Sequence, residues 1–160
     1  MRKQQEQKDL LDQIDQFLAS TPEMRLALRQ VIKLLHNRFE YFNWTGIYLL
    51  KENMLKLADY CGAPSPHTEI PVGKGICGSA VALKATQNIP DVNADSRYFA
   101  CNLETKSEIV VPIISDDRIW GEIDIDSHQP AAFDRTDEQF LQQVADRLAA
   151  YFDKNTKTTG

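Results

Sequence analysis

Residues 118–126 divide into two sets of alternating side chains, a pattern typical of a β-strand that packs one face into a core. One face would carry Ile119, Gly121, Ile123 and Ile125, and the other Trp120, Glu122, Asp124 and Asp126. Successive side chains of a strand point to opposite faces, so Asp124 and Asp126 should share a face with their carboxylates close together. The segment therefore predicts a strand that presents paired carboxylates.

Two β-hairpins are predicted in the middle of the chain. Residues 44–50 and 54–60 are rich in β-preferring types and are joined by a short turn, and residues 108–115 and 118–126 are joined by Asp116-Asp117. Between the hairpins, a glycine-rich stretch from Gly73 indicates a loop that opens a short helix ending near Lys84. Residues 91–106 show no periodicity, which predicts a long loop of the kind that is usually functional or disordered.

Helical periodicity is confined to the two ends of the chain. The first helix should span roughly residues 4 to 19. The second should be capped by Thr21, hold Pro22 in its first turn and end near Phe39. A terminal helix carries Phe140, Leu141, Val144, Leu148 and Phe152. This order predicts an α+β fold, with a central, mainly antiparallel sheet and the N- and C-terminal helices packed on one face.

Composition excludes several classes of protein. A chain of 160 residues is about one domain, and its net charge of −5 argues against nucleic-acid and anionic-membrane partners. No apolar run approaches the ~20 residues of a membrane span, and the polar N-terminus lacks a signal-peptide pattern. Three cysteines without a regular framework fit a reducing compartment, so a cytoplasmic location is expected.

Several motifs follow one another in a characteristic order: residues 43–48 (NWTGIY), 70–78 (IPVGKGICG), 100–101 (AC), 107–112 (SEIVVP) and 124–127 (DIDS). Together they resemble the free methionine-(R)-sulfoxide reductase family, which consists of stand-alone GAF-domain enzymes. The resemblance runs from about Phe39 to Phe152. It implies a GAF fold, and we expect residues 1–160 to form a single GAF domain, with N-terminal helices (1–39), a GAF core (40–153) and a frayed polar tail (154–160).

The resemblance also implies roles for individual residues. Cys101 matches the cysteine that attacks the sulfoxide sulfur, and Trp44 matches a tryptophan that encloses the methyl-sulfinyl end of the substrate. Glu108, Asp124 and Asp126 match the acidic residues that bind the ammonium group of the free amino acid. Simple electrostatics agrees, because an ammonium ion offsets the repulsion among three carboxylates. The alternatives are a packed thiol at Cys101, core packing for Trp44 and solvated aspartates.

One position departs from the family pattern, because His67 stands where the family usually has a resolving cysteine. An oxidised Cys101 would then be resolved by Cys77, which matches another family cysteine, by Cys61, or by an external thiol. Cys77 lies at a helix start, where the dipole would lower its pKa, although simple packing is equally compatible with its position. The three histidines lack metal-ligand spacing, and a surface position is expected for His67.

The sequence thus predicts a thiol-dependent oxidoreductase that reduces free L-methionine-(R)-sulfoxide to methionine. Cys101 would form a sulfenic acid, with Glu108 or an aspartate assisting loss of the oxygen as water. Cys77 would form a disulfide with Cys101, and a thioredoxin-like reductant would restore both thiols without a metal or organic cofactor. The alternative is a non-catalytic GAF module that binds a small metabolite as a sensor. The N-terminal helices either mediate a homodimer or cover the sheet.

Overall fold

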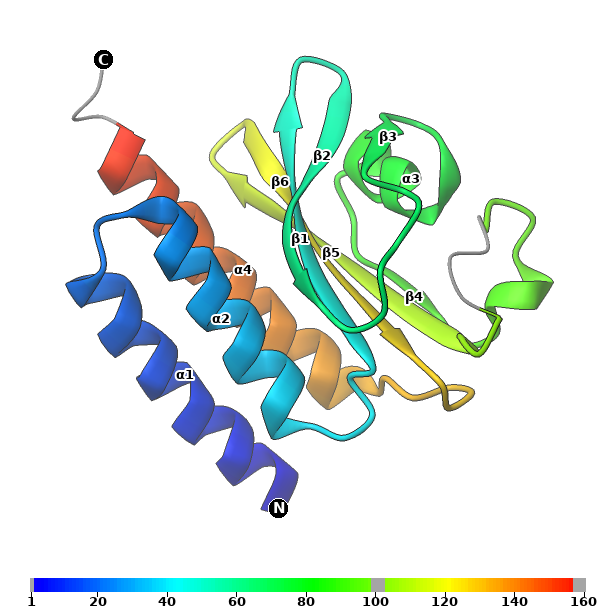
Figure 1. The fold of residues 1–160 in the computed structure, drawn as a ribbon, viewed down its shortest axis with the longest axis horizontal. Helices are drawn as coiled ribbons and strands as arrows, with labels where there is room; N and C mark the ends of the chain where they lie inside the picture. Colours follow the sequence, from blue (N-terminus) through cyan, green and yellow to red (C-terminus); the bar gives the residue numbers. More distant parts are fainter. Residues whose placement is uncertain (1, 99–102, 157–160) are drawn as a thin grey trace.

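The computed structural model describes residues 2–98 and 103–156, which form one six-stranded antiparallel sheet with helices on both faces (Figure 1). The strand order is β3-β2-β1-β6-β5-β4. In chain order the elements are α1 (Arg2–Ser20), α2 (Met24–Arg38), β1 (Trp44–Lys51), β2 (Met54–Cys61), β3 (Glu69–Pro71), α3 (Gly75–Leu83), β4 (Gln87–Ile89), the 3-10 turn η1 (Val92–Ala94), β5 (Ser107–Ser115), β6 (Arg118–Ser127) and α4 (Arg135–Thr156).

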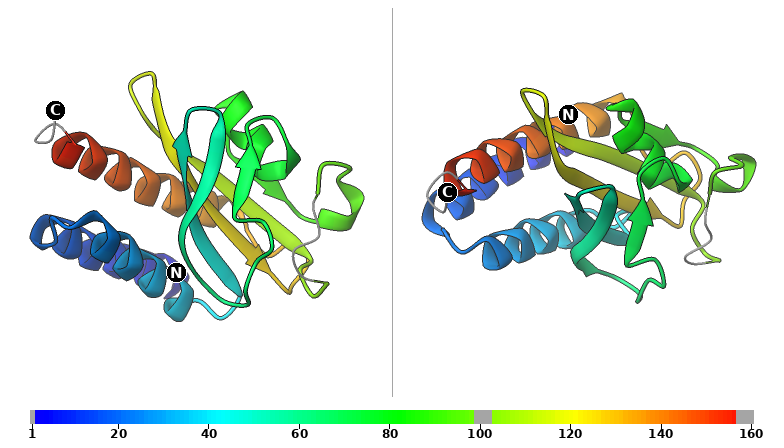
Figure 2. Two further views of the ribbon diagram at one scale, coloured as in Figure 1. Left: turned by 45° about the horizontal axis from the view of Figure 1, so that its top comes forward. Right: turned by 90° about the horizontal axis from the view of Figure 1, so that it is seen from above.

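The long helices lie on one side of the sheet and α3 on the other, as both views in Figure 2 show. Helix α2 contacts β1 and β2, α4 contacts β5 and β6, and α1 packs on α2 and α4. Helix α3 contacts β3, β5 and β6. The predicted α+β class, with terminal helices on one face of an antiparallel sheet, is therefore confirmed. Within the described residues, none of these helices combines the length and apolar character needed to cross a membrane.

The sheet separates two apolar cores. Alternate side chains along its strands point to opposite faces, so each strand contributes residues to both cores. Ile47 of β1, Ile109 of β5, and Ile123 and Ile125 of β6 are fully buried against the long helices. The intervening residues of the same strands face α3, where they form a smaller core that includes Trp44, Tyr48, Cys77 and Val110. Because α3 covers the central strands on this face, the polar side chains Glu108, Asp124 and Asp126 of β5 and β6 are buried as well.

The predicted alternation of β6 holds for the acidic residues but is wrong at its start. The register shifts where Ile113 pairs with Gly121 and Ile114 with Ile119, which leaves Trp120 as an extra residue in the ladder. Ile119 therefore packs on the α3 side, while Trp120 packs on the helix side, 5.5 Å from the ring of Phe152. Glu122, Asp124 and Asp126 keep the predicted face.

Two helix boundaries also differ from prediction. Glu23, not Thr21, caps α2, since its carboxylate accepts hydrogen bonds from the backbone N–H groups of Arg25 (3.3 Å) and Leu26 (3.0 Å). Helix α4 continues to Thr156, so residues 154–156 of the expected tail are helical, while residues 157–160 lie outside the described part. The short strands β3 and β4 were not predicted at all.

Asp137 joins three separate segments at the base of the helical layer. This fully buried carboxylate accepts hydrogen bonds from the Tyr41 hydroxyl (2.6 Å), the Gln7 amide (3.1 Å) and the Asp134 backbone N–H (3.0 Å), and it pairs with the Lys3 ammonium (2.7 Å). The α1 helix and the loop before β1 are thereby tied to the start of α4.

Replacing Asp137 with alanine should lower the free energy of unfolding by about 3 kcal/mol, because the buried Gln7 amide and the partly buried Tyr41 hydroxyl and Lys3 ammonium would lose their common acceptor. Urea unfolding followed by circular dichroism measures this. Asp146→Ala is the matched control, since Asp146 lies on the exposed face of the same helix and accepts a hydrogen bond from Gln142. A change under about 0.5 kcal/mol is expected for the control, and equal midpoints for the two variants would contradict the proposed role of Asp137.

Candidate active site

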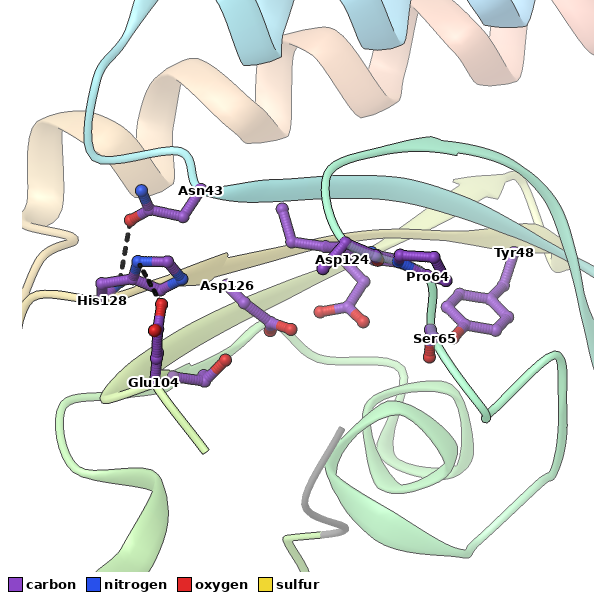
Figure 3. Close-up of a pocket in the computed structure, with 11 residues that line it drawn as sticks. Asn43, Tyr48, Pro64, Ser65, Glu104, Asp124, Asp126 and His128 are labelled. Carbon is purple, nitrogen blue, oxygen red and sulfur yellow. Dashed lines mark hydrogen bonds and ion pairs between the residues drawn. The ribbon is translucent and has the colours of Figure 1, made fainter. Parts of the chain in front are cut away.

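Two adjoining cavities open on the α3 face of the sheet. The larger, about 150 Å³, is lined by residues from β1 and β6, the loop after β2, and residues 104–105. Figure 3 shows Asp124 and Asp126 along it, between His128 and Glu104 at one end and Ser65 and Tyr48 at the other. The smaller cavity shares Tyr48 and both aspartates and extends to α3. A volume of this size accommodates one small organic molecule.

Three carboxylates meet where the two cavities join. Glu108 of β5 lies directly opposite Asp126 in the ladder with β6, and Asp124 follows on the same face. Each is about 95% buried. Among the described residues, no lysine, arginine or histidine forms an ion pair with Asp124 or Asp126, and one carboxylate oxygen of each accepts no hydrogen bond.

Burial makes the ionised forms of these acids costly. It is the main cause that raises the pKa of Asp124, and it raises the pKa of Asp126 well above its ordinary range together with the negative charge of Asp124. Like charges at this spacing share protons or require a cation. The site is therefore electrostatically prepared for a positively charged group.

Cys77 joins this acidic cluster from the first turn of α3. Its Sγ lies 3.4 Å from Oδ2 of Asp124 and 3.8 Å from Oε1 of Glu108. The expectation that the helix dipole lowers the pKa of this thiol is wrong. Burial, and then the charges of Asp124, Glu122 and Glu108, raise its pKa well above the ordinary value, because these effects outweigh a partial charge at a helix end.

Trp44 belongs to the core on the α3 side and also lines the larger cavity. A packing role and a role in enclosing a ligand are therefore compatible for this residue. Its indole N–H donates to the carbonyl of Ala63 (2.9 Å), and its ring stacks on Tyr60 with centroids 5.6 Å apart. The ring also covers Gly46, where a Cβ atom would lie 2.4 Å from it. A glycine at position 46 is thus required for the tryptophan to lie flat along β1.

Two residues of the site were missed by sequence reasoning. Tyr48 lines both cavities and donates its hydroxyl to the carbonyl of His67 (2.7 Å), and Glu122 is fully buried beside the acidic cluster. Burial and the charge of Asp124 raise the pKa of Glu122 well above its ordinary range. Period-two alternation already placed Glu122 on the face of Asp124 and Asp126, and the same spacing applied from Trp44 would have placed Tyr48 on the face of Trp44.

His67 and Cys61, two further residues considered in the sequence analysis, lie on opposite sides of the sheet. His67, expected on the surface, is half-buried and lines the smaller cavity with Cys77. Cys61 packs on the opposite face, against the core beneath the long helices. Cys101 lies outside the described residues. Of its neighbours in the sequence, Tyr98 lines the smaller cavity and Glu104 and Thr105 line the larger one.

Comparison with known proteins identifies the class. The family model described as GAF domain matches residues 23–152, so the chain belongs to the GAF-domain family. The free methionine-R-sulfoxide reductase of Escherichia coli is 35% identical over 92% of this chain and 89% of its own length. That of Saccharomyces cerevisiae is 46% identical over 107 residues, 64% of this chain and 59% of its own.

A solved structure agrees with these relatives. The X-ray structure of free methionine-R-sulfoxide reductase from Neisseria meningitidis, in complex with its substrate, superposes with a TM-score of 0.90 at 34% identity, covering 95% of this chain and 91% of that one. Within the GAF class, the chain therefore belongs to the free methionine-R-sulfoxide reductase family. The resemblance predicted from the motifs is confirmed.

The burial and electrostatics of Cys77 predict that it resists alkylation in the folded protein. Iodoacetamide should modify Cys77 at least about tenfold more slowly than the partly exposed Cys61, as followed by peptide mass mapping over time. In urea the two cysteines should react at similar rates, which provides the control. If Cys77 in the folded protein were alkylated as fast as Cys61, the conclusion that Cys77 is a buried thiol with a raised pKa would be wrong.

Proposed function

We propose that this protein reduces free L-methionine-(R)-sulfoxide to methionine. The observation that carries the proposal is the trio Glu108, Asp124 and Asp126, buried at a cavity that accommodates one small molecule. A free amino acid brings an α-ammonium group, which would neutralise part of this charge and form charge-assisted hydrogen bonds with the carboxylates. The names of the relatives point to the same substrate.

The two parts of the cavity suit the two ends of such a substrate. The acidic trio would hold the ammonium group, while the aromatic side chains of Trp44 and Tyr48 would enclose the methyl-sulfinyl end. Because the ammonium group is essential to this binding mode, a methionine sulfoxide within a peptide would leave the buried carboxylates without their cation. Discrimination against peptides thus follows from the cost of unpaired buried charge.

The proposed chemistry begins with the Cys101 sulfur. It attacks the sulfoxide sulfur, the oxygen passes to Cys101 as a sulfenic acid, and methionine leaves, with Glu108 or an aspartate supplying the proton. The position of Tyr98 supports this role, since it lines the smaller cavity and the three peptide units between it and Cys101 span at most about 11 Å.

A second thiol then condenses with the sulfenic acid, forming a disulfide and releasing the oxygen as water. Cys77 is the internal thiol favoured by the structure, because it lines the cavity while Cys61 lies across the sheet. The raised pKa of Cys77 slows this step, since the thiolate is the attacking form. A dithiol reductant of the thioredoxin class would restore both cysteines. A cytoplasmic location and a homodimer through the N-terminal helices belong to the same proposal.

Turnover should be specific for the free R epimer. NADPH consumption coupled to thioredoxin and thioredoxin reductase should occur with L-methionine-(R)-sulfoxide and not with the S epimer. Cys101→Ser should lower kcat by at least about a thousandfold, and Cys61→Ser should leave it unchanged. The N-acetylated R epimer, which lacks the ammonium group, should lose at least about a hundredfold in kcat/KM. Absence of turnover by the wild type, or a Cys101→Ser variant with wild-type activity, would overturn the proposal.

The oxidation state of the cysteines after treatment with the sulfoxide distinguishes a catalyst from a sensor. After one equivalent of the R epimer, intact-mass analysis should show a disulfide that peptide mapping assigns to Cys77 and Cys101. In Cys77→Ser, one equivalent of methionine should still be released, and Cys101 should accumulate as a dimedone-reactive sulfenic acid. Binding of the sulfoxide with all thiols unchanged would instead favour the non-catalytic sensor suggested by His67.

A further inference from the structure

The thiol and carboxylates of the smaller cavity form a compact set of potential metal ligands. Sγ of Cys77, one oxygen of Glu108 and one of Asp124 all lie within 4.8 Å of one another, and all three residues are buried. They come from α3, β5 and β6, so the distances between them depend on how these three elements pack together. The packing of α3 on the sheet holds them together.

Their spacing matches that of ligands around one tetrahedral ion. With a metal–sulfur bond of about 2.3 Å and a metal–oxygen bond of about 2.1 Å, a tetrahedral site separates sulfur from oxygen by about 3.6 Å. The observed separations are 3.4 Å from Cys77 to Asp124 and 3.8 Å from Cys77 to Glu108. Small side-chain movements would therefore complete such a site.

Asp126 provides an independent indication that a ligand belongs here. It is not one of the three clustered residues, it is 6% exposed, and its Oδ1 accepts no hydrogen bond from the described part of the chain. It lines the same cavity as Cys77, and Figure 3 shows its carboxylate beside that of Asp124. A buried carboxylate oxygen without a donor is costly, and a cation at the cluster would offset that cost.

We propose that Cys77, Glu108 and Asp124 form a binding site for a thiophilic divalent cation of the Zn²⁺ class, with Asp126 adjacent to complete the coordination. The thiol favours this class over Mg²⁺ and Ca²⁺, which take oxygen ligands. On binding, the sulfur–metal bond replaces the S–H bond and the proton leaves to solvent. The ion would act as an inhibitor and not as a cofactor, because it takes up carboxylates and a thiol that the reduction requires; this consequence rests on the proposed function.

Cobalt(II) is a spectroscopic probe for this site. Titration of the reduced protein with Co²⁺ should give one equivalent bound and a near-ultraviolet thiolate-to-cobalt charge-transfer band, which Zn²⁺ should abolish by displacement. The band should persist in Cys61→Ser and disappear in Cys77→Ser. In Glu108→Gln, which keeps the thiol and the shape of the side chain, affinity should fall more than about tenfold. Circular dichroism verifies that each variant is folded.

Several results would overturn the proposal. They are a band that survives in folded Cys77→Ser, a band lost in Cys101→Ser but not in Cys77→Ser, and an unchanged affinity in Glu108→Gln. Binding is measured without substrate, so its failure is distinguishable from a lack of reductase activity. The competition is tested separately: free methionine sulfoxide should displace Co²⁺ from the wild type, and retention of the metal at saturating sulfoxide would refute the shared site.

Discussion

The antiparallel pairing of β6 with β1 on one side and β5 on the other is the constraint on which this molecule depends. That register directs Ile123 and Ile125 into the helical core and Asp124 and Asp126 toward α3. A slip of one residue would exchange the two sets and place carboxylates beneath the long helices. The fold and the acidic site are therefore specified by the same hydrogen-bonded ladder.

Much of the site could be predicted because it depends on local rules. Alternation along β6 suffices to place Asp124 and Asp126 on one face. The two-residue turn alone would pair Glu108 with Ile125, and the extra residue Trp120 moves Glu108 opposite Asp126. Trp120 was misplaced because one extra residue in the ladder reverses the alternation, and nothing in the local sequence marks the bulge. The edge strands β3 and β4 were missed because three residues give no periodicity, and their pairing comes from neighbouring strands.

The chemistry of Cys77 could not be predicted because it is a tertiary property. Sequence gives its place at the start of a helix, and that place alone favours a lowered pKa. The structure adds burial and three carboxylates from two strands that lie far away in the chain. In a region of low dielectric, full charges at hydrogen-bonding distance outweigh the partial charge of a helix end.

The electrostatics of the acidic cluster would couple substrate binding to activation of the Cys77 thiol. Burial raises the pKa of Cys77, and the same negative charges that would attract an ammonium group raise it further. A positive charge beside Glu108 and Asp124 must stabilise both carboxylates and the Cys77 thiolate, because the ligand atoms of these three residues lie within 4.8 Å of one another. Departure of methionine would reverse the effect, so a resolving thiol at this position would be most reactive while an ammonium group is bound. With His67 in place of the usual family cysteine, Cys77 is the only thiol on the cavity side among the described residues. In the proposed mechanism, its reactivity would therefore depend on whether the site is occupied.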